Sequence, residues 1–297
     1  MKWYGGIEAG GTKFNCMIAN NPDQILDEIR ISTTTPDETL PEVISFFKSA
    51  ISRENIEVTS LGIGSFGPLG LNTSASDYGY ITSTPKIAWR NTPLLSQLQN
   101  ALNLPTAFDT DVNAAALGEG KWGAAAGCEN YVYLTIGTGI GGGAFVNGKP
   151  VHGLIHPEMG HVFLPHDFTV DPFPGSCPTH GDCIEGLASG PALKDRWGIP
   201  AEQLPLDHPA WHLEARYLAY MLANIVLTLS PERIIMGGGV MNVPGLIGKV
   251  QRELADVLNG YVQNENILEN IEQYVRHPGL GDRAGVLGSI ALAQTIT

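Results

Sequence analysis

Short apolar runs that break off into glycine recur along the chain and predict buried strands followed by tight turns. Twice such a run is followed by a second one, within residues 4–19 and within residues 131–146, so we expect two strand–turn–strand hairpins. Helical patterns separate these runs, and strands that alternate with helices are typical of an α/β fold. The predicted strands span residues 4–8, 14–19, 61–65, 105–108, 131–136, 144–146 and 234–240.

Several helices carry recognisable start sequences. Residues 35–38 (Thr-Pro-Asp-Glu) form a capping box with proline at the first helical position, which predicts a helix to about residue 53. Residues 210–229 have long apolar stripes, which are typical of a helix in the core. Further helices are expected from Thr92, from Val112 with an end weakened by Gly118 and Gly120, and from Arg283.

Composition narrows the possible partners. A chain of 297 residues that is 43% hydrophobic has room for two domains with buried cores. Its net charge of −13 argues against nucleic acid or an anionic membrane surface as a partner. The sequence contains no run of 18 apolar residues, so no membrane span is expected. The first residues also lack the apolar stretch of a signal peptide. Four cysteines fit a reducing cytoplasm better than a disulfide framework.

The loop between residues 153 and 192 carries the pattern H-x15-C-x2-H-x2-C. Two thiolates and two imidazoles make a complete tetrahedral zinc set with no position left for a catalytic water. The loop has too few apolar residues to hold its own shape, so a metal would explain its order. Reduced surface cysteines beside incidental histidines are the alternative. The predicted ligands are His161, Cys177, His180 and Cys183.

Glycine-rich segments end or follow four of the predicted strands. Residues 10–13 (Gly-Gly-Thr-Lys) could bring backbone N–H groups and a lysine to a phosphate, although these residues taken alone favour a bare hairpin turn. This is not a Walker A loop, because Thr12 stands where lysine is required. The glycines around positions 62–67 and 137–142 match G-x-G-x-x-G, but no helix follows either one, so a dinucleotide site is not expected. We expect a glycine loop over residues 137–143 and a turn at residues 237–239 that either admits a flat ring or simply leads into a helix.

Asp111 stands immediately before a predicted helix. Aspartate is a preferred residue at the N-cap, so a capping role competes with a catalytic one, and the two can coexist at one helix terminus.

The motif E-x-G-H at residues 158–161, followed by a loop that ends in C-x-E, resembles the ROK sugar kinases. The form CPTHGDCIEGLASGPA at residues 177–192 resembles their bacterial fructokinase branch, and the resemblance extends over essentially the whole chain. It implies the two-domain, ribonuclease H-like α/β fold of actin, hexokinase and the Hsp70 ATPase, with a cleft that closes on the substrates. We therefore expect an N-terminal domain over residues 1–115 and a C-terminal domain over residues 116–297, whose last helix packs back near the hinge.

The same resemblance assigns roles to individual residues. D-x-N-A-A makes Asp111 the catalytic base, with Mg²⁺ at the chemistry and zinc in a structural role. Two departures from the family pattern are Glu8, in place of the more usual aspartate near Mg²⁺, and Thr110, in place of asparagine, which we interpret as a specificity difference. The implied sugar ligands are Gly67, Asn113, Glu158, His161 and Glu185. The implied ATP contacts are Gly10, Gly11, Thr12, Lys13, Thr135, Gly137, Thr138, Gly139, Pro191, Gly237, Gly238 and Gly239.

The activity implied is ATP-dependent phosphorylation of D-fructose to fructose 6-phosphate by a cytoplasmic homodimer. A kinase for mannose or glucose shares every motif named so far and stays open. The ROK family also includes sugar-responsive repressors, but these carry an N-terminal helix-turn-helix, whereas here the first glycine turn begins by residue 10. A sugar sensor without catalytic activity is the remaining alternative.

Overall fold

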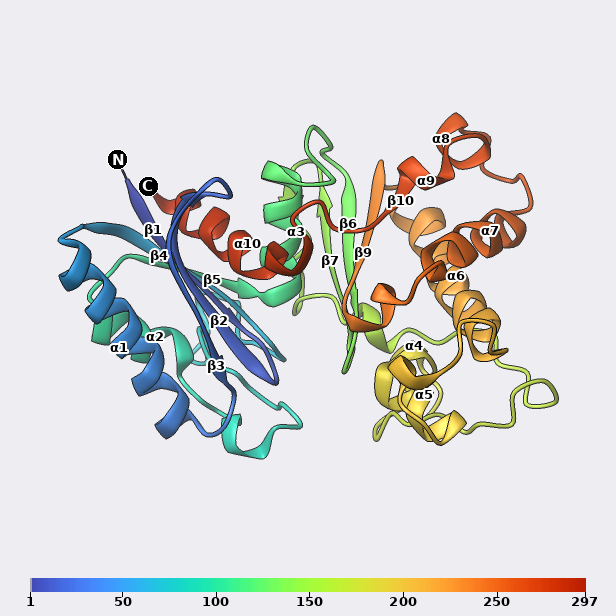
Figure 1. Cartoon of the computed structure of the whole chain (residues 1–297), viewed down its shortest axis with the longest axis horizontal. Helices are drawn as coiled ribbons and strands as arrows, with labels where there is room; N and C mark the ends of the chain where they lie inside the picture. The colour runs from blue at the N-terminus through green and yellow to red at the C-terminus, as the bar shows by residue number, and fades with distance from the viewer. Residues whose placement is uncertain (1) are drawn as a thin grey trace. The chain divides into compact units, whose positions relative to one another are not determined.

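The computed structural model describes residues 2–297, which divide into two compact units (Figure 1). Unit 1 contains the described residues up to 127, then residues 150–157 and 279–297, and unit 2 contains residues 128–149 and 158–278. Each unit is built from a sheet and helices, so the expected α/β class is confirmed. Unit 1 extends past the expected boundary at residue 115, because helix α3 (Asp111–Trp122) packs along helix α10 (Ala284–Ala293) of the same unit.

The sheet of unit 1 has the strand order β3-β2-β1-β4-β5. Its first three strands form an antiparallel meander, whereas β1, β4 and β5 run parallel. The carboxyl ends of these three parallel strands therefore meet at one edge of the sheet. The strands are β1 Trp3–Ala9, β2 Lys13–Asn21, β3 Gln24–Ser32, β4 Val58–Ser65 and β5 Thr106–Thr110.

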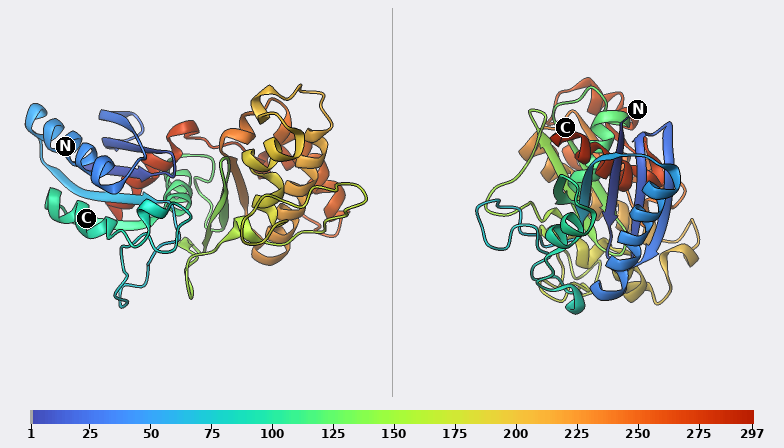
Figure 2. Two further views of the ribbon diagram at one scale, coloured as in Figure 1. Left: turned by 90° about the horizontal axis from the view of Figure 1, so that it is seen from below. Right: turned by 90° about the vertical axis from the view of Figure 1, so that its left-hand side faces the viewer.

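Helices cover both faces of this sheet (Figure 2). Helices α1 (Pro36–Glu54) and α2 (Leu94–Leu102) belong to the apolar core on one face, and α10 packs on the other. Adjacent glycines of β1 show how close this packing is. A Cβ atom at Gly5 would lie 2.8 Å from the Leu61 side chain, and one at Gly6 would lie 2.8 Å from the Val286 carbonyl oxygen. A larger residue at either position would separate the layers.

The sheet of unit 2 has the strand order β10-β9-β6-β7-β8, and β6 pairs antiparallel with β7 and parallel with β9. The predicted glycine loop over residues 137–143 was too long, because β7 starts at Ile140 and includes three of those glycines. Helix α6 (Ala210–Leu229) has the predicted bounds and packs against α4 and α7. The strands are β6 Tyr131–Ile136, β7 Ile140–Val146, β8 Lys149–Pro150, β9 Arg233–Gly237 and β10 Val275–Arg276. The remaining α-helices of unit 2 are α4 Ile184–Ala188, α5 Gly190–Trp197, α7 Leu246–Leu258, α8 Glu265–Leu268 and α9 Ile271–Tyr274.

One helix start and one helix end differ from expectation. Thr35 is the N-cap of α1, but its side chain accepts no capping hydrogen bond. Hydrogen bonds from Thr34 and Thr35 lower the pKa of Glu38, so only the glutamate half of the capping box is formed. Helix α3 is continuous past Gly118 to Trp122, where a weak end was expected.

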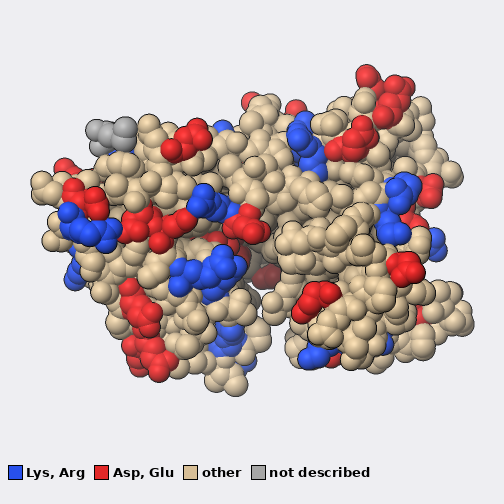
Figure 3. Space-filling model, viewed as in Figure 1, with Lys and Arg blue, Asp and Glu red and all other residues tan. Residues whose placement is uncertain are grey.

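No helix within residues 2–297 combines the length and the apolar character needed to cross a membrane. On the face shown in Figure 3, acidic and basic side chains are interspersed.

Candidate functional site

Three predicted functional segments lie at the carboxyl edge of the unit 1 sheet. The turn of residues 10–13 follows β1, Gly67 follows β4, and Asp111 follows β5. The strand registers pair Ala9 with Ser65 and Ser65 with Thr110, so the three segments leave neighbouring strands at the same level. Ligands of open α/β sheets bind at this edge.

The first glycine turn is braced on both sides. The Gly10 N–H donates to the Lys13 carbonyl (3.0 Å), which closes the hairpin. The Thr33 hydroxyl donates to the Gly10 carbonyl (2.8 Å), and the Thr33 N–H donates to the Thr12 carbonyl (3.0 Å). A Cβ atom at Gly10 would lie 2.8 Å from the Lys13 carbonyl oxygen, so this close turn requires glycine.

Glu8 lies just before this turn, with its carboxyl group against helix α10. The Asn15 side-chain amide donates to Glu8 Oε2 (2.6 Å), and a Cβ atom at Gly285 would overlap the Glu8 carboxyl group. Burial raises the pKa of Glu8, an effect that its hydrogen bond with Asn15 and the charge of Lys13 oppose. Glu8 is therefore held within the protein on one side, which limits its freedom to bind a metal ion.

Asp111 is the first residue of α3, and the N-cap is Thr110. The Thr110 hydroxyl accepts from the Asn113 N–H (3.1 Å), while Asp111 Oδ1 accepts from the Val112 N–H (2.9 Å). The capping role considered for Asp111 thus belongs to its neighbour. Thr110, which we expected to affect substrate specificity, has a structural role as the N-cap of α3.

A polar cluster that the sequence did not suggest surrounds Asn113. The carboxylate oxygen Oδ1 of Asp109 accepts from the Thr110 N–H (2.7 Å) and from the Asn113 side-chain amide (2.8 Å). His152 Nε2 lies 3.1 Å from the same oxygen, and this hydrogen bond raises the pKa of His152. Asp109 is only 6% exposed, so the cluster fixes the start of α3 from a buried carboxylate.

A second histidine of residues 150–157 holds the Gly67 turn. His156 Nε2 accepts from the Leu69 N–H (3.1 Å), and a Cβ atom at Gly67 would lie 3.4 Å from the His156 ring. Residues 150–157 thus contact the predicted sugar residues Gly67 and Asn113 through one histidine each. Nothing in the local sequence points to either contact, because Asn113 is 39 residues from His152 and Gly67 is 89 residues from His156.

The predicted nucleotide residues of unit 2 come together at one edge of its sheet. Strand β6 leads into Gly137–Gly139 and pairs with β9, whose Gly237 is opposite Thr135. The Gly190 N–H donates to the Gly137 carbonyl (2.8 Å), which brings the start of α5, with Pro191, against this loop. Gly238 has φ = +92°, and a Cβ atom there would overlap the Ile136 backbone, so glycine is required.

Glu185, two residues after the predicted metal ligand Cys183, contacts the glycine loop of residues 137–139. Its Oε2 accepts from the Ile140 N–H (2.9 Å), and a Cβ atom at Gly139 would lie 2.7 Å from that oxygen. One oxygen of this predicted sugar ligand is thus already engaged by the backbone next to Gly139.

The four predicted metal ligands are gathered in unit 2, with one donor atom from each within 4.8 Å of all the others. His161 Nδ1 lies 3.5 Å from the sulfur of Cys183 and 3.9 Å from that of Cys177, and His180 Nδ1 lies 3.7 Å from the Cys177 sulfur. In a zinc tetrahedron with bonds of about 2.0 Å to nitrogen and 2.3 Å to sulfur, nitrogen and sulfur are about 3.5 Å apart. The donor set therefore fits a tetrahedral ion.

Burial and a bound cation have opposite effects on the pKa values of the thiols in this cluster. Burial, with the neighbouring Cys177 thiol as a lesser cause, raises the pKa of Cys183 to about 11. A bound divalent ion lowers thiol pKa values and holds both sulfurs as thiolates.

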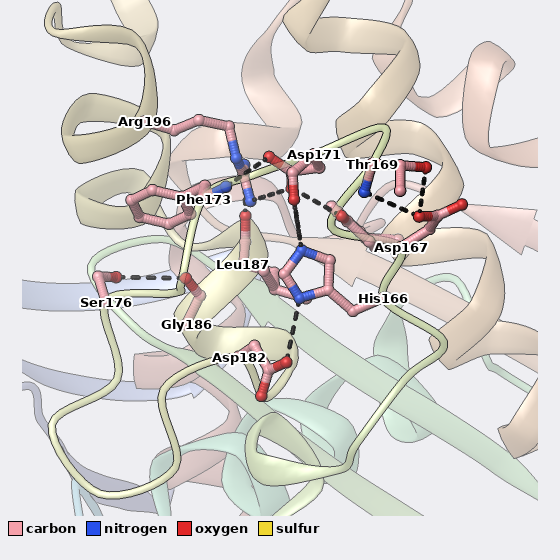
Figure 4. A network of polar contacts seen from close by, with 11 residues as sticks. His166, Asp167, Thr169, Asp171, Phe173, Ser176, Asp182, Gly186, Leu187 and Arg196 are labelled. Carbon is pink, nitrogen blue, oxygen red and sulfur yellow. Dashed lines mark hydrogen bonds and ion pairs between the residues drawn. The ribbon is translucent and has the colours of Figure 1, made fainter.

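A buried polar network centred on His166 and Asp171 holds the segment that contains the predicted metal ligands (Figure 4). His166 Nδ1 lies 3.0 Å from the Asp182 carboxylate, and His166 Nε2 lies 3.0 Å from the Asp171 carbonyl oxygen. The Asp171 carboxylate accepts from the Tyr217 hydroxyl (2.7 Å) and pairs with Arg196 (3.2 Å). The network ties the loop to α5 and α6 through contacts independent of the four ligands.

Comparison with known proteins places this chain among sugar kinases. The ROK family model matches residues 4–296. A fructokinase of Lactococcus lactis subsp. cremoris is 46% identical, with 99% of this chain and 98% of that protein covered. A fructokinase of Zymomonas mobilis subsp. mobilis is 45% identical, with 98% and 96% covered. Among solved structures, the ROK hexokinase from Thermus thermophilus is 26% identical with a TM-score of 0.80, and the match covers 99% of this chain and 98% of that one.

Proposed function

The chain belongs to the ROK family, and on that premise we propose that it is a fructokinase that transfers the terminal phosphoryl group of ATP to the 6-hydroxyl of D-fructose. The observation that carries the kinase assignment is the common sheet edge of the glycine turn 10–13 and Asp111. The relatives named fructokinase, at 45–46% identity over nearly the whole chain, support fructose as the acceptor.

Asp111 would accept the proton of the fructose hydroxyl as its oxygen attacks the γ-phosphorus, the bond to the β–γ bridging oxygen breaks, and ADP leaves. The proton would then pass to solvent. Thr110 and Asn113 hold the backbone on either side of this carboxylate, so its position does not depend on the substrate. A base fixed in this way contributes through orientation as well as proton affinity.

The glycine loops would hold the triphosphate mainly through backbone N–H groups, so the net charge of −13 does not oppose binding. The segments proposed for this role are residues 10–13, residues 135–139 and the start of α5. The turn at residues 237–239 would accept the adenosine, since a Cβ at Gly239 would meet nothing within 4 Å. Mg²⁺ bound with ATP would neutralise phosphate charge.

The residues proposed to bind sugar hydroxyls are Gly67, Asn113, Glu158, His161 and Glu185. Glu185 Oε2 is taken by the Ile140 N–H, so Oε1 would accept from the sugar. His161 Nδ1 faces the two sulfurs, which leaves Nε2 for a hydroxyl. Zinc on His161, Cys177, His180 and Cys183 would order the segments that carry Glu158 and Glu185.

The test is a panel of fructose, mannose and glucose assayed with ATP and Mg²⁺, with product position determined by ³¹P NMR. We expect the highest kcat/KM for fructose and phosphorylation at O6. A higher value for mannose or glucose would favour the broader hexose kinase. Fructose binding without turnover of any sugar would favour a sensor.

The resemblance also leads us to infer a cytoplasmic homodimer. Size-exclusion chromatography with light scattering tests the dimer, and cell fractionation tests the location.

A further inference from the structure

A lysine that no motif includes lies over the first glycine turn. Lys86 is 75 residues from Gly11 in sequence, yet a Cβ atom at Gly11 would lie 3.1 Å from Lys86 Cε. The absence of a side chain at Gly11 leaves the space through which the lysine approaches the turn. Both residues belong to unit 1.

Packing fixes the segment that carries Lys86. The Lys86 N–H donates to the Thr84 hydroxyl (3.3 Å), and the Lys86 carbonyl accepts from the Trp89 N–H (2.8 Å). Trp89 is 1% exposed and packs on Phe14, the residue after Lys13, with ring centroids 5.3 Å apart. The tryptophan thus anchors the Lys86 segment to the same strand that leaves the glycine turn.

A second anchor ties this segment to the connection between β3 and α1. The Trp89 indole N–H donates to the Thr34 carbonyl (2.8 Å), directly after Thr33, which braces the glycine turn. The distance between Lys86 and the turn is therefore set by buried contacts and not by a mobile loop.

The charge of Lys86 has no acidic partner in unit 1. Although the protein has 30 acidic residues against 17 basic ones, none within residues 2–297 forms an ion pair with Lys86. Arg53 and Arg283, on the same unit, do have such partners. A lysine without an acidic partner, placed over the glycine turn that also carries Lys13, supplies positive charge for an anion.

We propose that Lys86 binds the phosphates of the nucleotide together with the Gly10–Lys13 turn. This rests on the proposed use of ATP. Lysine acts at such a site as a compact charge that follows the phosphate oxygens, so it would strengthen binding of ATP and ADP over AMP.

The test is isothermal titration calorimetry of ATP, ADP and AMP with the full-length protein and three variants, Lys86→Met, Lys86→Arg and Lys48→Met. Lys48 is an exposed lysine of α1 and serves as the matched control. We expect Lys86→Met to weaken ATP binding roughly 10- to 100-fold, as loss of a charged hydrogen bond would, and to leave AMP binding unchanged. Lys86→Arg should recover part of the loss, and Lys48→Met should bind all three nucleotides like the parent.

Two results would overturn the proposal. In one, Lys86→Met binds ATP as tightly as the parent. In the other, it loses ATP and AMP affinity equally, which indicates a structural role. Because binding is measured without fructose, a parent that binds ATP but phosphorylates no sugar would refute the proposed function alone. A parent that binds no ATP would refute both.

Discussion

Thr110 and Asp111 divide two tasks at the start of helix α3. Thr110 caps the helix through its hydroxyl, and Asp111 presents its carboxylate from the first helical position. Substitutions at these two neighbouring positions should therefore affect different properties, which allows the catalytic proposal to be separated from stability.

We expect Asp111→Asn to lower kcat by about 10²- to 10⁴-fold or more, because the asparagine amide cannot accept the proton. This range is the usual contribution of a general base. Melting temperature and fructose affinity should stay close to those of the parent, since asparagine has the same shape and the cap is elsewhere. Thr110→Ala is the comparison variant: it should cost about 1 kcal/mol of stability, and it should lower kcat far less than Asp111→Asn because the base itself is kept. An active Asp111→Asn enzyme would refute the role of Asp111 as base.

His152 should make stability depend on pH. Its folded-state pKa is raised, first by the hydrogen bond with Asp109, so its contribution is fully present below the unfolded pKa. That contribution is lost as pH rises through the folded pKa. We therefore expect the melting temperature of the parent to exceed that of His152→Gln by more at pH 5.5 than at pH 8.5. The side chain is 40% exposed, so solvent screens the effect.

Melting curves of both proteins across this range provide the measurement, with His212→Gln, an exposed site on α6, as control. A difference between the parent and His152→Gln that is constant with pH would contradict the expectation.

At the scale of single residues, the sequence predicted what close spacing encodes. The loop from Cys177 to Cys183 indicates a metal site because three of the four donors recur there at every third residue. His152, His156 and Lys86 could not be found in this way. Their partners Asp109, Leu69 and Gly11 are 43 to 87 residues distant, and only the fold brings them together.

Helices α3 and α10 cross at a pair of glycines, which sets how closely the two elements approach. A Cβ atom at Gly118 would lie 2.8 Å from Gly288 Cα, and one at Gly288 would overlap the Ala114 carbonyl. Gly118, one of the two glycines that suggested a weak helix end, is therefore a contact position. Tertiary packing outweighs the low helix propensity of glycine here.

Gly288→Ala should destabilise unit 1 by about 1–3 kcal/mol, as overpacking of a tight contact does. Urea unfolding followed by fluorescence would measure the change. Ala291→Gly, at a buried position of the same helix, is the control. It removes a methyl group in place of adding one, so it changes helix propensity without overpacking. Stability equal to the parent in Gly288→Ala would show that the helices can move apart without cost.

Element prediction succeeded where patterns are strong and failed where they are weak. The apolar stripes of residues 210–229 gave the bounds of α6, and glycine-terminated runs gave β1, β4 and β6 within a few residues. Strand β3 was missed because it is a half-exposed edge strand with charged residues among its apolar ones. The glycine-rich start of β7 resembled a loop, yet pairing with β6 made it a strand.

At the scale of the whole molecule, the chain passes between the two units four times, at residues 127/128, 149/150, 157/158 and 278/279. Unit 1 therefore depends on a segment from the far end of the sequence. Glu119 secures that return: its carboxylate accepts from the Gly279 N–H (2.8 Å), the Leu280 N–H (2.9 Å) and the Ala124 N–H (2.6 Å). A boundary drawn once along the sequence cannot represent such a fold.

Because all four predicted metal ligands lie in unit 2, loss of the metal should change the structure mainly around these ligands. We expect about one zinc per chain and, after chelation, faster hydrogen exchange over residues 174–185. The part of the loop held by His166, Asp171 and Arg196 should exchange more slowly than residues 174–185, since that network needs no metal. Hydrogen exchange in unit 1 should not change after chelation. Cys177→Ser should reproduce the chelated pattern.

Mass spectrometry of exchanged peptides, together with elemental analysis of protein purified without added metal, gives the measurement. Cys128→Ser, which removes a thiol of the same unit outside the loop, should bind zinc and exchange like the parent. Unchanged exchange in residues 174–185 after the metal is removed would mean that the ligands are packed by the protein alone, and the proposed ordering of Glu158 and Glu185 by zinc would fail. Faster exchange throughout both units would instead show that the metal stabilises the whole molecule, which the separate cores of the two units argue against.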